Sequence, residues 1–450
     1  MALTQVSTGG VKDDAITKAK IPANQIEASE LADNAVDTNA IADNAVSSVK
    51  IPANAVTQAK IADDAVGADQ LASNAVVTAS IADNAITQAK INVPISNRNL
   101  IINGAMLVAQ RSTDITTGNA GVHCVDRIDG ESSNADEAPR RQQVDVSSSS
   151  TPYTLGFRKA FKLTNGNQTS GAGADDIMNI RYNIESQDIV NSGWNYKSAS
   201  SFVTLQFWIK SSVSQNFNIY LRTRDGTNQT YAFDTGTLSA DTWTKITKTI
   251  SGNANIQLDN DNGQGLQINF GPFWGTNRTS SSVVNEVWQG YNSASRMKDN
   301  ATTWYTTDNA TLEITGLQLE VGSVATDFEH RSFGQELALC QRYFQEYTHG
   351  THRGVGGFCG RKSGSSTVVG TMYGFPPMRA AATGSVDNLG AFKMFRYSDG
   401  TTSTPTAVGV THQGSVEPFT DLKFTFTVSS FASTGNMCGM FTTASSGKLT

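Results

Sequence analysis

The segment Ile41-Ala42-Asp43-Asn44-Ala45-Val46-Ser47-Ser48-Val49-Lys50 is one copy of a ten-residue repeat in the first part of this 450-residue chain. The first position of successive copies is aliphatic, at Ile21, Leu31, Ile41, Ile51, Ile61, Leu71, Ile81 and Ile91. A second aliphatic series lies halfway between, at Ile16, Ile26, Val36, Val46, Val56, Val66, Val76 and Ile86. Self-similarity at a fixed period indicates an array of small units.

Aliphatic residues spaced five apart fit neither regular secondary structure. In a strand they would point to opposite faces. In an α-helix five residues advance by about 500°, so successive aliphatics would lie about 140° apart around the axis. The chain must therefore turn within each decad, either as a short strand with a turn or as one helical turn. The Thr-Gln-Ala-Lys sequences at 57–60 and 87–90 slightly favour the helical turn.

The repeat carries too little apolar surface to fold as a single copy. No Phe, Trp or Tyr precedes Tyr153, and each decad offers only two aliphatics and some alanines. Ordering the backbone costs roughly 1–2 kcal/mol per residue, which this burial cannot offset. We therefore predict a parallel homotrimeric shaft over residues 13–95, with residues 1–12 as an attachment tip. The alternative, a disordered tail, would not preserve two aliphatic series in register.

Composition and charge narrow the class of protein. Only 16% of residues are charged and 39 are glycine, a mixture typical of turn-rich β-structure. The formal net charge of -6 gives no reason to expect a nucleic-acid partner. No apolar run approaches the roughly 18 residues that span a bilayer. The N-terminal sequence lacks the features of a signal peptide, so we expect synthesis in a cytoplasm without secretion.

No residue pattern predicts a metal or cofactor. The four cysteines are far apart and the five histidines are scattered. The acidic stretch at 259–263 departs from a calcium loop, because its Gly comes one place early and no Glu occupies the twelfth position. We expect a turn there, and we expect the cysteines to be reduced apolar fillers, at Cys124, Cys340, Cys359 and Cys438.

Residues 96–330 are predicted to form an antiparallel, jelly-roll-like β-sandwich. Alternating apolar and polar residues recur in short segments separated by turn sequences, as at 203–209, 217–221, 246–250 and 266–270. In the segment 312–321 the alternation changes phase at Gly316, which predicts a β-bulge. Many strands of similar length with turns between them are typical of two packed sheets.

A helix and a second β-region follow. Ser332 and Gln335 fit a capping box, and Leu337, Cys340 and Phe344 share one helical face, so we predict a helix over 331–349. Residues 350–450 contain further strand patterns, including Phe424, Phe426 and Val428. We predict a small C-terminal β-domain at the tip of the molecule.

Tryptophan and tyrosine in polar surroundings are candidate sugar-binding residues. Sugars present apolar C–H faces to aromatic rings and hydroxyls to neighbouring amides. On this basis we select four residues as a candidate glycan platform, with core packing as the alternative for each: Trp288, Tyr291, Trp304 and Tyr305.

Two bracketing motifs and the decads resemble known fibre proteins. Asn99-Leu100-Ile101-Ile102-Asn103-Gly104-Ala105-Met106, followed by Val108-Ala109-Gln110-Arg111 and Asp126-Arg127, resembles the start of a domain found in phage and prophage tail fibres. Residues 316–322, Phe328-Glu329 and the stretch 335–347 resemble its end. The decads resemble the stalks of tail and head fibres, including those of cyanophages. The resemblance covers most of residues 10–350.

The resemblance implies a trimeric virion fibre with a carbohydrate-binding-like jelly roll. Such a fibre is made in the host cytoplasm, joins other virion proteins through its N-terminus, and attaches to a host cell-surface polysaccharide or lipopolysaccharide. It resides in a tail or another external appendage. A capsid head fibre or decoration protein is an alternative with the same architecture.

A polysaccharide depolymerase is a further alternative. Glycoside hydrolysis needs two carboxylates at a set separation, and nothing in the sequence pairs them. The sequence contains no GxSxG, HExxH or Walker motif. We therefore expect that this protein is not an enzyme and has no catalytic residues.

Overall fold

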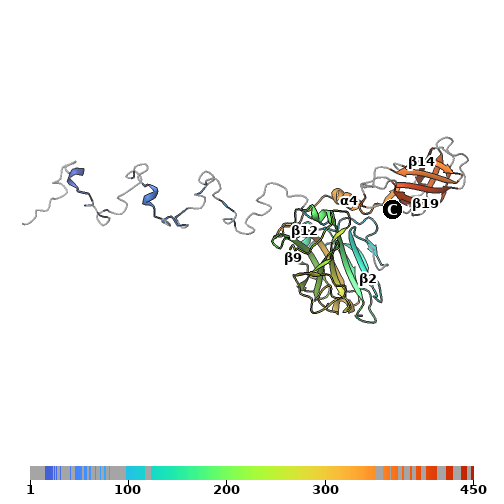
Figure 1. Cartoon of the computed structure of the whole chain (residues 1–450), viewed down its shortest axis with the longest axis horizontal. Helices are drawn as coiled ribbons and strands as arrows, with labels where there is room; N and C mark the ends of the chain where they lie inside the picture. Colours follow the sequence, from blue (N-terminus) through green and yellow to red (C-terminus); the bar gives the residue numbers. More distant parts are fainter. Residues whose placement is uncertain are drawn as a thin grey trace, which may run out of the picture. The chain divides into compact units, whose positions relative to one another are not determined.

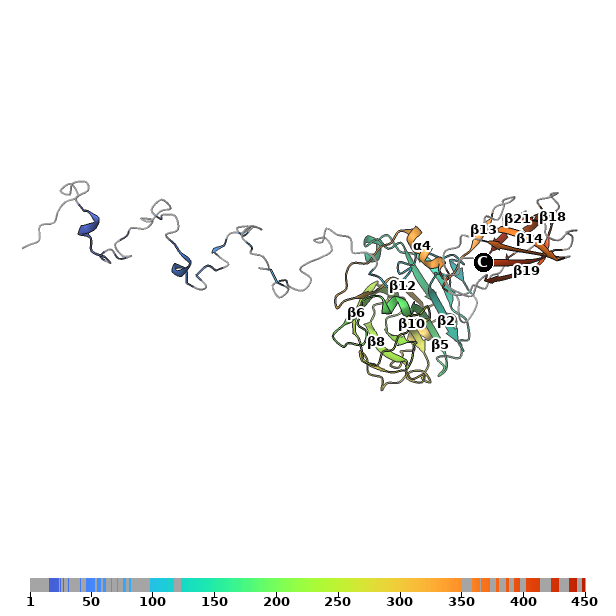
Figure 2. The ribbon, with the colours of Figure 1, turned by 45° about the horizontal axis from the view of Figure 1, so that its top comes forward.

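The computed structural model describes residues 98–116 and 123–349, together with parts of the flanking regions. These parts are 16–23, 25, 27, 31, 41, 46–52, 55–57, 60, 61, 66, 71, 76, 77, 81, 358–364, 366–372, 378–379, 386–387, 392–396, 402–412, 422–428, 437–442 and 447–449. The chain divides into two units, Met1–Lys90 and Ile91–Thr450. Figures 1 and 2 show the ribbon of both units.

The described decad residues contain single helical turns. The elements η2 (Lys18–Lys20) and η4 (Ser48–Lys50) are 3₁₀ turns, one at the end of each of two decads. In a third decad, the Lys60 amide donates to the Thr57 carbonyl at 2.9 Å. The slight preference for a helical turn at 57–60 is thus matched by this i→i−3 bond. The predicted turn at 87–90 and the attachment tip at 1–12 lie outside the described residues.

The aliphatic series of the decads are exposed within a single chain. Each described member has between 39% and 62% of its surface exposed. The described members of the first-position series are less exposed than those of the halfway series, and all of them belong to unit Met1–Lys90. The described members are Ile16, Ile21, Leu31, Ile41, Val46, Ile51, Val56, Ile61, Val66, Leu71, Val76 and Ile81. Within one chain, the described members of both aliphatic series are therefore left roughly half exposed.

Two six-stranded antiparallel sheets form the middle of the second unit. Sheet A has the order β1 (Asp114–Ile115), β3 (Arg140–Asp145), β4 (Lys159–Thr164), β12 (Thr311–Val321), β6 (Phe202–Ser211), β9 (Thr244–Ser251). Sheet B has the order β11 (Trp288–Gly290), β8 (Gln229–Thr237), β7 (Asn216–Thr223), β10 (Gln264–Trp274), β5 (Ile177–Glu185), β2 (Ile128–Ser133). Figure 2 labels strands of both sheets.

The strand order is that of a jelly roll. Strands β4, β5, β6 and β7 alternate between the sheets, and their hydrogen-bonded partners in reverse order are β12, β10, β9 and β8. This nested pairing is a long hairpin wrapped into two sheets. Strands β1, β3, β2 and β11 extend the sheet edges. The prediction of a mainly β, jelly-roll-like sandwich over this region is confirmed.

The sandwich core comes from the alternation that the sequence displays. Val203, Leu205, Phe207 and Ile209 of β6 are fully buried, and they face the apolar side chains of sheet B. The rings of Phe207 and Phe270 meet edge-to-face across the two sheets, with centroids 5.0 Å apart. Such aromatic pairs add to the burial that holds sandwich sheets together.

The predicted bulge at Gly316 is confirmed. The register of β12 against β6 shifts between Thr315 and Gln318, and Gly316 has a φ of 64°. A left-handed conformation favours glycine, because a Cβ there is strained. The bulge keeps Leu312 and Ile314 in the core before the shift, and Leu317 and Leu319 after it.

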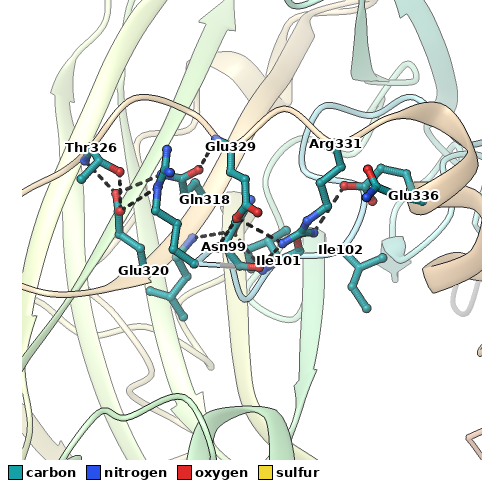
Figure 3. Close-up of polar contacts among 12 residues, drawn as sticks. Asn99, Ile101, Ile102, Gln318, Glu320, Thr326, Glu329, Arg331 and Glu336 are labelled. Carbon is teal, nitrogen blue, oxygen red and sulfur yellow. Dashed lines mark hydrogen bonds and ion pairs between the residues drawn. The ribbon is translucent and has the colours of Figure 1, made fainter. Parts of the chain in front are cut away.

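The segments that resemble the start and end of a fibre domain meet in space. The Asn99 side chain donates to the Leu317 carbonyl at 3.3 Å and accepts from the amides of Ile101 and Leu319 at 3.0 and 3.1 Å. The backbone amide of Asn99 donates to the Glu329 carboxylate at 2.7 Å. Figure 3 shows this entering segment against β12 and the segment that follows it.

Arg331 and Glu336 complete this junction (Figure 3). Arg331 donates to the carbonyls of Asn99 and Ile101 and lies 3.4 Å from Glu336. Glu336 accepts from the Asn103 amide at 2.6 Å. Burial raises the pKa of Glu336, although the Asn103 amide and Arg331 act in the opposite direction. The junction therefore closes the sandwich where the chain enters and leaves it.

The four α-helices among the described residues of the second unit are short. They are α1 (Thr151–Thr154), α2 (Ser186–Val190), α3 (Thr303–Thr306) and α4 (Phe333–Gln341). Helix α4 begins with the predicted capping box of Ser332 and Gln335. It ends at Gln341, so the prediction of a helix to residue 349 is wrong, and Tyr347–His349 instead form strand β13. The reason is that Arg342 and Tyr343 are held by Glu185 of the sandwich.

The described residues of the C-terminal region form two antiparallel sheets. A three-stranded sheet has the order β13 (Tyr347–His349), β22 (Gly447–Leu449), β16 (Val386–Asp387). A seven-stranded sheet has the order β18 (Thr402–Ser403), β17 (Phe392–Arg396), β21 (Met437–Thr442), β14 (Phe358–Gly364), β15 (Thr367–Met372), β20 (Leu422–Val428), β19 (Pro405–His412). The alternating Phe424, Phe426 and Val428 of β20 are all buried.

Candidate functional site

The outer face of sheet B carries a cluster of long polar side chains. In β7 the core residues Ile219 and Leu221 alternate with Tyr220 and Arg222 on the other face. The same alternation puts Gln267 and Asn269 of β10, and Asn179 and Arg181 of β5, on that outer face. A sheet face open to solvent usually exposes such residues, yet Tyr220, Asn269 and Asn179 are each at most 3% exposed. Other groups therefore cover part of this face.

Strand register joins these residues into rows. Arg181 pairs with Asp129 of β2 on one side and with Asn269 on the other, and Asn269 pairs in turn with Tyr220. In the adjacent row Gln267 lies between Asn183 and Arg222. Directly opposed residues on antiparallel strands bring their Cβ atoms to within about 4.5–5.5 Å. The polar groups of four strands thus form one continuous surface.

A bulge in β10 adds Trp274 to this surface. The register of β10 against β5 shifts between Phe270 and Phe273, so Phe273 returns to the core while Trp274 lies on the outer face. Gly271 makes room for the indole, because a Cβ at this position would meet Trp274 Cδ1 at 2.8 Å. Without the extra residue, Trp274 would share the parity of Phe270 and point inward.

The chain between β10 and α3 forms a wall beside Trp274. Val283 and Met297 pack with Tyr220 and Trp274 in a small apolar cluster. The rings of Tyr220 and Trp274 meet edge-to-face with centroids 6.0 Å apart. The guanidinium of Arg296 stacks on the Trp274 ring, with its Cζ 4.4 Å from the centroid. This wall therefore adds the Arg296 side chain to the site.

Together these groups line a cavity of about 290 Å³, which we call the sheet B site. Its lining is polar apart from two aromatic rings: Glu131, Arg181, Tyr220, Arg222, Arg224, Gln264, Gln267, Asn269, Trp274 and Arg296. The volume is at the lower end of the range typical of small-molecule sites.

Four buried donors of the sheet B site lack partners among the described residues: Trp274 Nε1, Asn269 Nδ2, Arg181 Nε and Arg296 Nε. Trp274 Nε1 and Asn269 Nδ2 form no hydrogen bond among the described residues, although their side chains are at least 97% buried. Asn269 uses only its oxygen, which accepts from Asn179 at 3.1 Å. Buried donors without partners cost free energy, and in native proteins they call for an explanation such as a ligand.

Burial shapes the titration of the site. It raises the pKa of the Tyr220 phenol to about 12, against an opposing effect of nearby Arg296. Burial also lowers the pKa of the Arg222 guanidinium, and the charges of Arg224 and Arg296 lower it further. The arginines are thus close enough to repel one another.

The four sequence-predicted glycan residues separate into two groups. Tyr291 lies beside the sheet B site, where Arg222 stacks on its ring with Cζ 3.5 Å from the centroid. Trp304 and Tyr305 are completely buried, and Trp288 is 8% exposed with its Nε1 bonded to the Ser251 carbonyl at 2.7 Å. Trp304, Tyr305 and Trp288 fill the sandwich core, so their rings offer no face to a sugar. Core packing is the alternative given for each of them in the sequence analysis.

The sequence contained a partial signal for the remaining site residues. The polar members of alternating segments, such as Tyr220 and Arg222, are predicted to lie on an outer face once the core parity is known. Their assembly depends on β7, β10 and β5 being neighbours, and on the bulge that reverses Trp274. Neither feature is visible in local periodicity.

A second cavity lies on sheet A. It measures about 260 Å³ and its lining includes Phe157, Trp208 and Phe328, with Lys245 and Asp327 as the charged groups. Trp208, on the face of β6 opposite to Phe207, is half-buried there. This cavity has few polar groups and no unpaired donor among the described side chains, so it is a weaker candidate.

Within the described residues, no group of His, Cys, Asp and Glu side chains has the arrangement of a metal site. Cys124 and Cys340 are free and buried, and burial raises the pKa of the Cys124 thiol to about 12. No helix among the described residues has the length and apolar character required to cross a bilayer.

Comparisons with known proteins found similarity to solved structures alone. No known family model matches the sequence, and no curated protein is similar to it. A putative sugar binding protein from Bacteroides thetaiotaomicron aligns over 50% of this chain and 100% of its own, with 11% identity and a TM-score of 0.27. A family 30 carbohydrate-binding module aligns over 50% and 93%, with 12% identity and a TM-score of 0.23.

A phage protein is among the similar structures. The enzymatically active domain of tailspike protein 4 from bacteriophage CBA120 aligns over 50% of this chain, with 11% identity and a TM-score of 0.24. The alignment covers 21% of the chain of that enzymatically active domain. TM-scores this low do not assign a function, so the proposal below rests on the side chains of this molecule.

Proposed function

We propose that this protein is a trimeric attachment fibre of a phage virion that binds a cell-surface glycan through the sheet B site, without catalysis. The observation that carries the proposal is the sheet B site itself. It combines amides, guanidiniums and two aromatic residues in one solvent-open cavity, with buried donors left unpaired. Amide and guanidinium groups in such a cavity can form hydrogen bonds with the hydroxyls of a saccharide, while Tyr220 and Trp274, each 3% exposed, shape its wall.

The lack of catalysis is supported by the carboxylates of the site. Glycosidases need two carboxyl groups about 5–9.5 Å apart, one on each side of the scissile bond. Glu131 is the single carboxylate lining the cavity, and it is paired with Arg181 at 3.1 Å. An ion-paired carboxylate without a second one beside it is suited to positioning an arginine.

The trimeric shaft is supported by the exposed aliphatic rows of the decads. Apolar side chains at regular ten-residue intervals, each between 39% and 62% exposed, are stabilised when identical copies cover them. The fibre assignment also draws on the meeting of the Asn99 segment with Gly316–Glu329, which the resemblance to phage fibres places at the two ends of one domain.

Binding of the intact chain to an array of bacterial surface polysaccharides tests the function. We expect binding that Asn269→Ala and Gln267→Ala weaken, and no oligosaccharide release from bound polymer. Retention of full affinity by both variants would contradict the assignment of the site. Release of oligosaccharides would identify a depolymerase instead.

A further inference from the structure

We propose that the sheet B site selects saccharides carrying a carboxylate, sulfate or phosphate group. This inference rests on the proposed glycan binding and specifies its substrate class. Four arginines and one carboxylate line the cavity, on a chain whose formal net charge is -6. The overall composition of an acidic chain does not account for this cluster of arginines. A ligand that binds at the site would account for it.

The protein's own carboxylates neutralise only one of the four arginines. Arg181 pairs with both Asp129 and Glu131 across strands β5 and β2. Among the described residues, the other three form no ion pair with an Asp or Glu: Arg222, Arg224 and Arg296. Arg222 instead meets a neutral partner, because the Asn228 amide oxygen can accept from its Nη2 at 2.7 Å.

One aromatic ring of the site, Trp274, and one beside it, Tyr291, are each contacted by one of these arginines. Arg296 stacks on Trp274 and Arg222 stacks on Tyr291. A ring face covered by a guanidinium is closed to the C–H face of a sugar. A guanidinium held against a ring can still donate from the N–H groups at its edge, and Arg296 Nε has no partner among the described residues. The rings therefore position arginines in place of stacking on a neutral sugar.

Mutual repulsion of these arginines also favours an anionic ligand. Burial and the neighbouring charges of Arg224 and Arg296 lower the pKa of Arg222, so its charged form is held at a cost in this site. An anion between them would relieve that cost. Carboxylate, sulfate and phosphate oxygens match the forked donors of arginine, and such charge-assisted bonds are about twice as strong as neutral ones.

The amides provide the saccharide part of the recognition. Gln267 lies in the same cross-strand row as Arg222, and Asn269 in the same row as Arg181. Asn269 Nδ2 and Trp274 Nε1 are unpaired donors suited to hydroxyl oxygens of a sugar. A free inorganic anion would leave these donors unused, so an anionic glycan uses more of the site than an anion alone.

The test compares glycans that share one backbone. Binding of the intact chain to dextran and to dextran sulfate is measured by affinity electrophoresis, with polygalacturonate and its carboxyl-reduced form as a second pair. We expect each charged polymer to bind about tenfold or more tightly than its neutral partner, and the difference to shrink as salt is added. Polyglutamate, an anion without sugar, is expected to bind more weakly than either charged glycan.

Arginine variants locate the effect. Arg224 is exposed just beyond β7, so Arg224→Gln leaves the core intact, while Arg296→Gln removes the cation stacked on Trp274. Each is expected to lower affinity for the charged polymers several-fold. The matched control is Arg140→Gln, because Arg140 pairs with Asp114 at the edge of sheet A. An equal loss with Arg140→Gln, or equal affinity for polyglutamate, would reduce the site to a nonspecific charge effect and overturn the inference.

The outcomes also separate this inference from the proposed function. Equal affinity for charged and neutral partners, with both weakened by Asn269→Ala, overturns the anionic preference and retains glycan binding. Failure to bind any neutral or anionic polysaccharide of the array contradicts glycan binding itself, and the inference with it.

Discussion

Glu185 shows how a single carboxylate ties the segment after helix α4 to the sandwich. It stands at the end of β5 and accepts from Arg342 Nε and Nη2 at 3.0 and 2.9 Å, and from the Tyr343 hydroxyl. Arg127 stacks on the Tyr343 ring with Cζ 3.4 Å from its centroid. Burial acts to raise the pKa of Glu185, but hydrogen bonds from Arg342, Tyr343 and Gln187 outweigh it, and the pKa is lowered.

The substitution Glu185→Gln is therefore expected to destabilise the sandwich at neutral pH by about 1–3 kcal/mol. An acid with a lowered folded pKa stabilises the protein above its unfolded pKa, and this contribution is lost as the pH falls through the folded value. The stability of wild type and variant should thus converge in acid. Denaturant unfolding followed by tryptophan fluorescence reports on this region, because all six tryptophans lie between 194 and 304.

The control for this prediction is an exposed ion pair. Asp145 is 82% exposed beside Lys159, so Asp145→Asn should change stability little at any pH. A Glu185→Gln effect that persisted unchanged at low pH would contradict the assigned role of its charge.

Gly271 leaves the space that the Trp274 indole occupies in the sheet B site. A Cβ at Gly271 would lie 2.5 Å from Met297 Cε and 2.8 Å from Trp274 Cδ1. We expect Gly271→Ala to displace Trp274, to cost about 1–3 kcal/mol of stability, and to weaken glycan binding. Gly290→Ala is the matched control, since no atom lies within 4 Å of a Cβ built there. Equal glycan affinity of Gly271→Ala and wild type would show that the indole position is unimportant.

At the scale of elements, local sequence patterns predicted some features and missed others. The bulge at Gly316 and the cap at Ser332 follow from the phase change and the Ser-x-x-Gln spacing, both local signals. The end of α4 could not be predicted from local sequence, because Arg342 and Tyr343 contact Glu185, which is distant in the sequence. Trp304 fills the core, which is the alternative given for it. Its polar sequence neighbours do not reveal this, because it lies in a short helix that inserts into the core.

The junction of the entering and leaving segments is expected to be cooperative. Arg331 is 11% exposed and contacts both Glu329 and Glu336 (Figure 3). Arg331→Met should therefore cost about 3–5 kcal/mol, because it removes the cation paired with the buried Glu336 carboxylate. Adding Glu336→Gln to Arg331→Met should restore part of that loss, measured by the same fluorescence-detected unfolding. Strictly additive effects of the two substitutions would show that they act independently.

At the scale of the whole molecule, periodicity predicted the fold class but not the position of the site. Alternation with period two indicates which residues of β7, β10 and β5 share the outer face. It carries no information about strand order, and the sheet B site exists because the jelly-roll connection places β10 between β7 and β5. For the decads, in contrast, the ten-residue period is by itself enough to predict that several copies of the chain associate.

That association is the most direct whole-molecule prediction. Light scattering should give the intact protein the mass of three copies of its 48.0 kDa chain. Replacing Ile41, Ile51 and Ile61 together by Ser should shift the trimer towards monomer at lower denaturant concentrations, because these side chains are between 43% and 45% exposed and need a cover. Val49→Ser is the control, since Val49 belongs to neither series and is 92% exposed. A monomeric wild type, or an equal effect of Val49→Ser, would contradict a shaft held together by the two aliphatic rows.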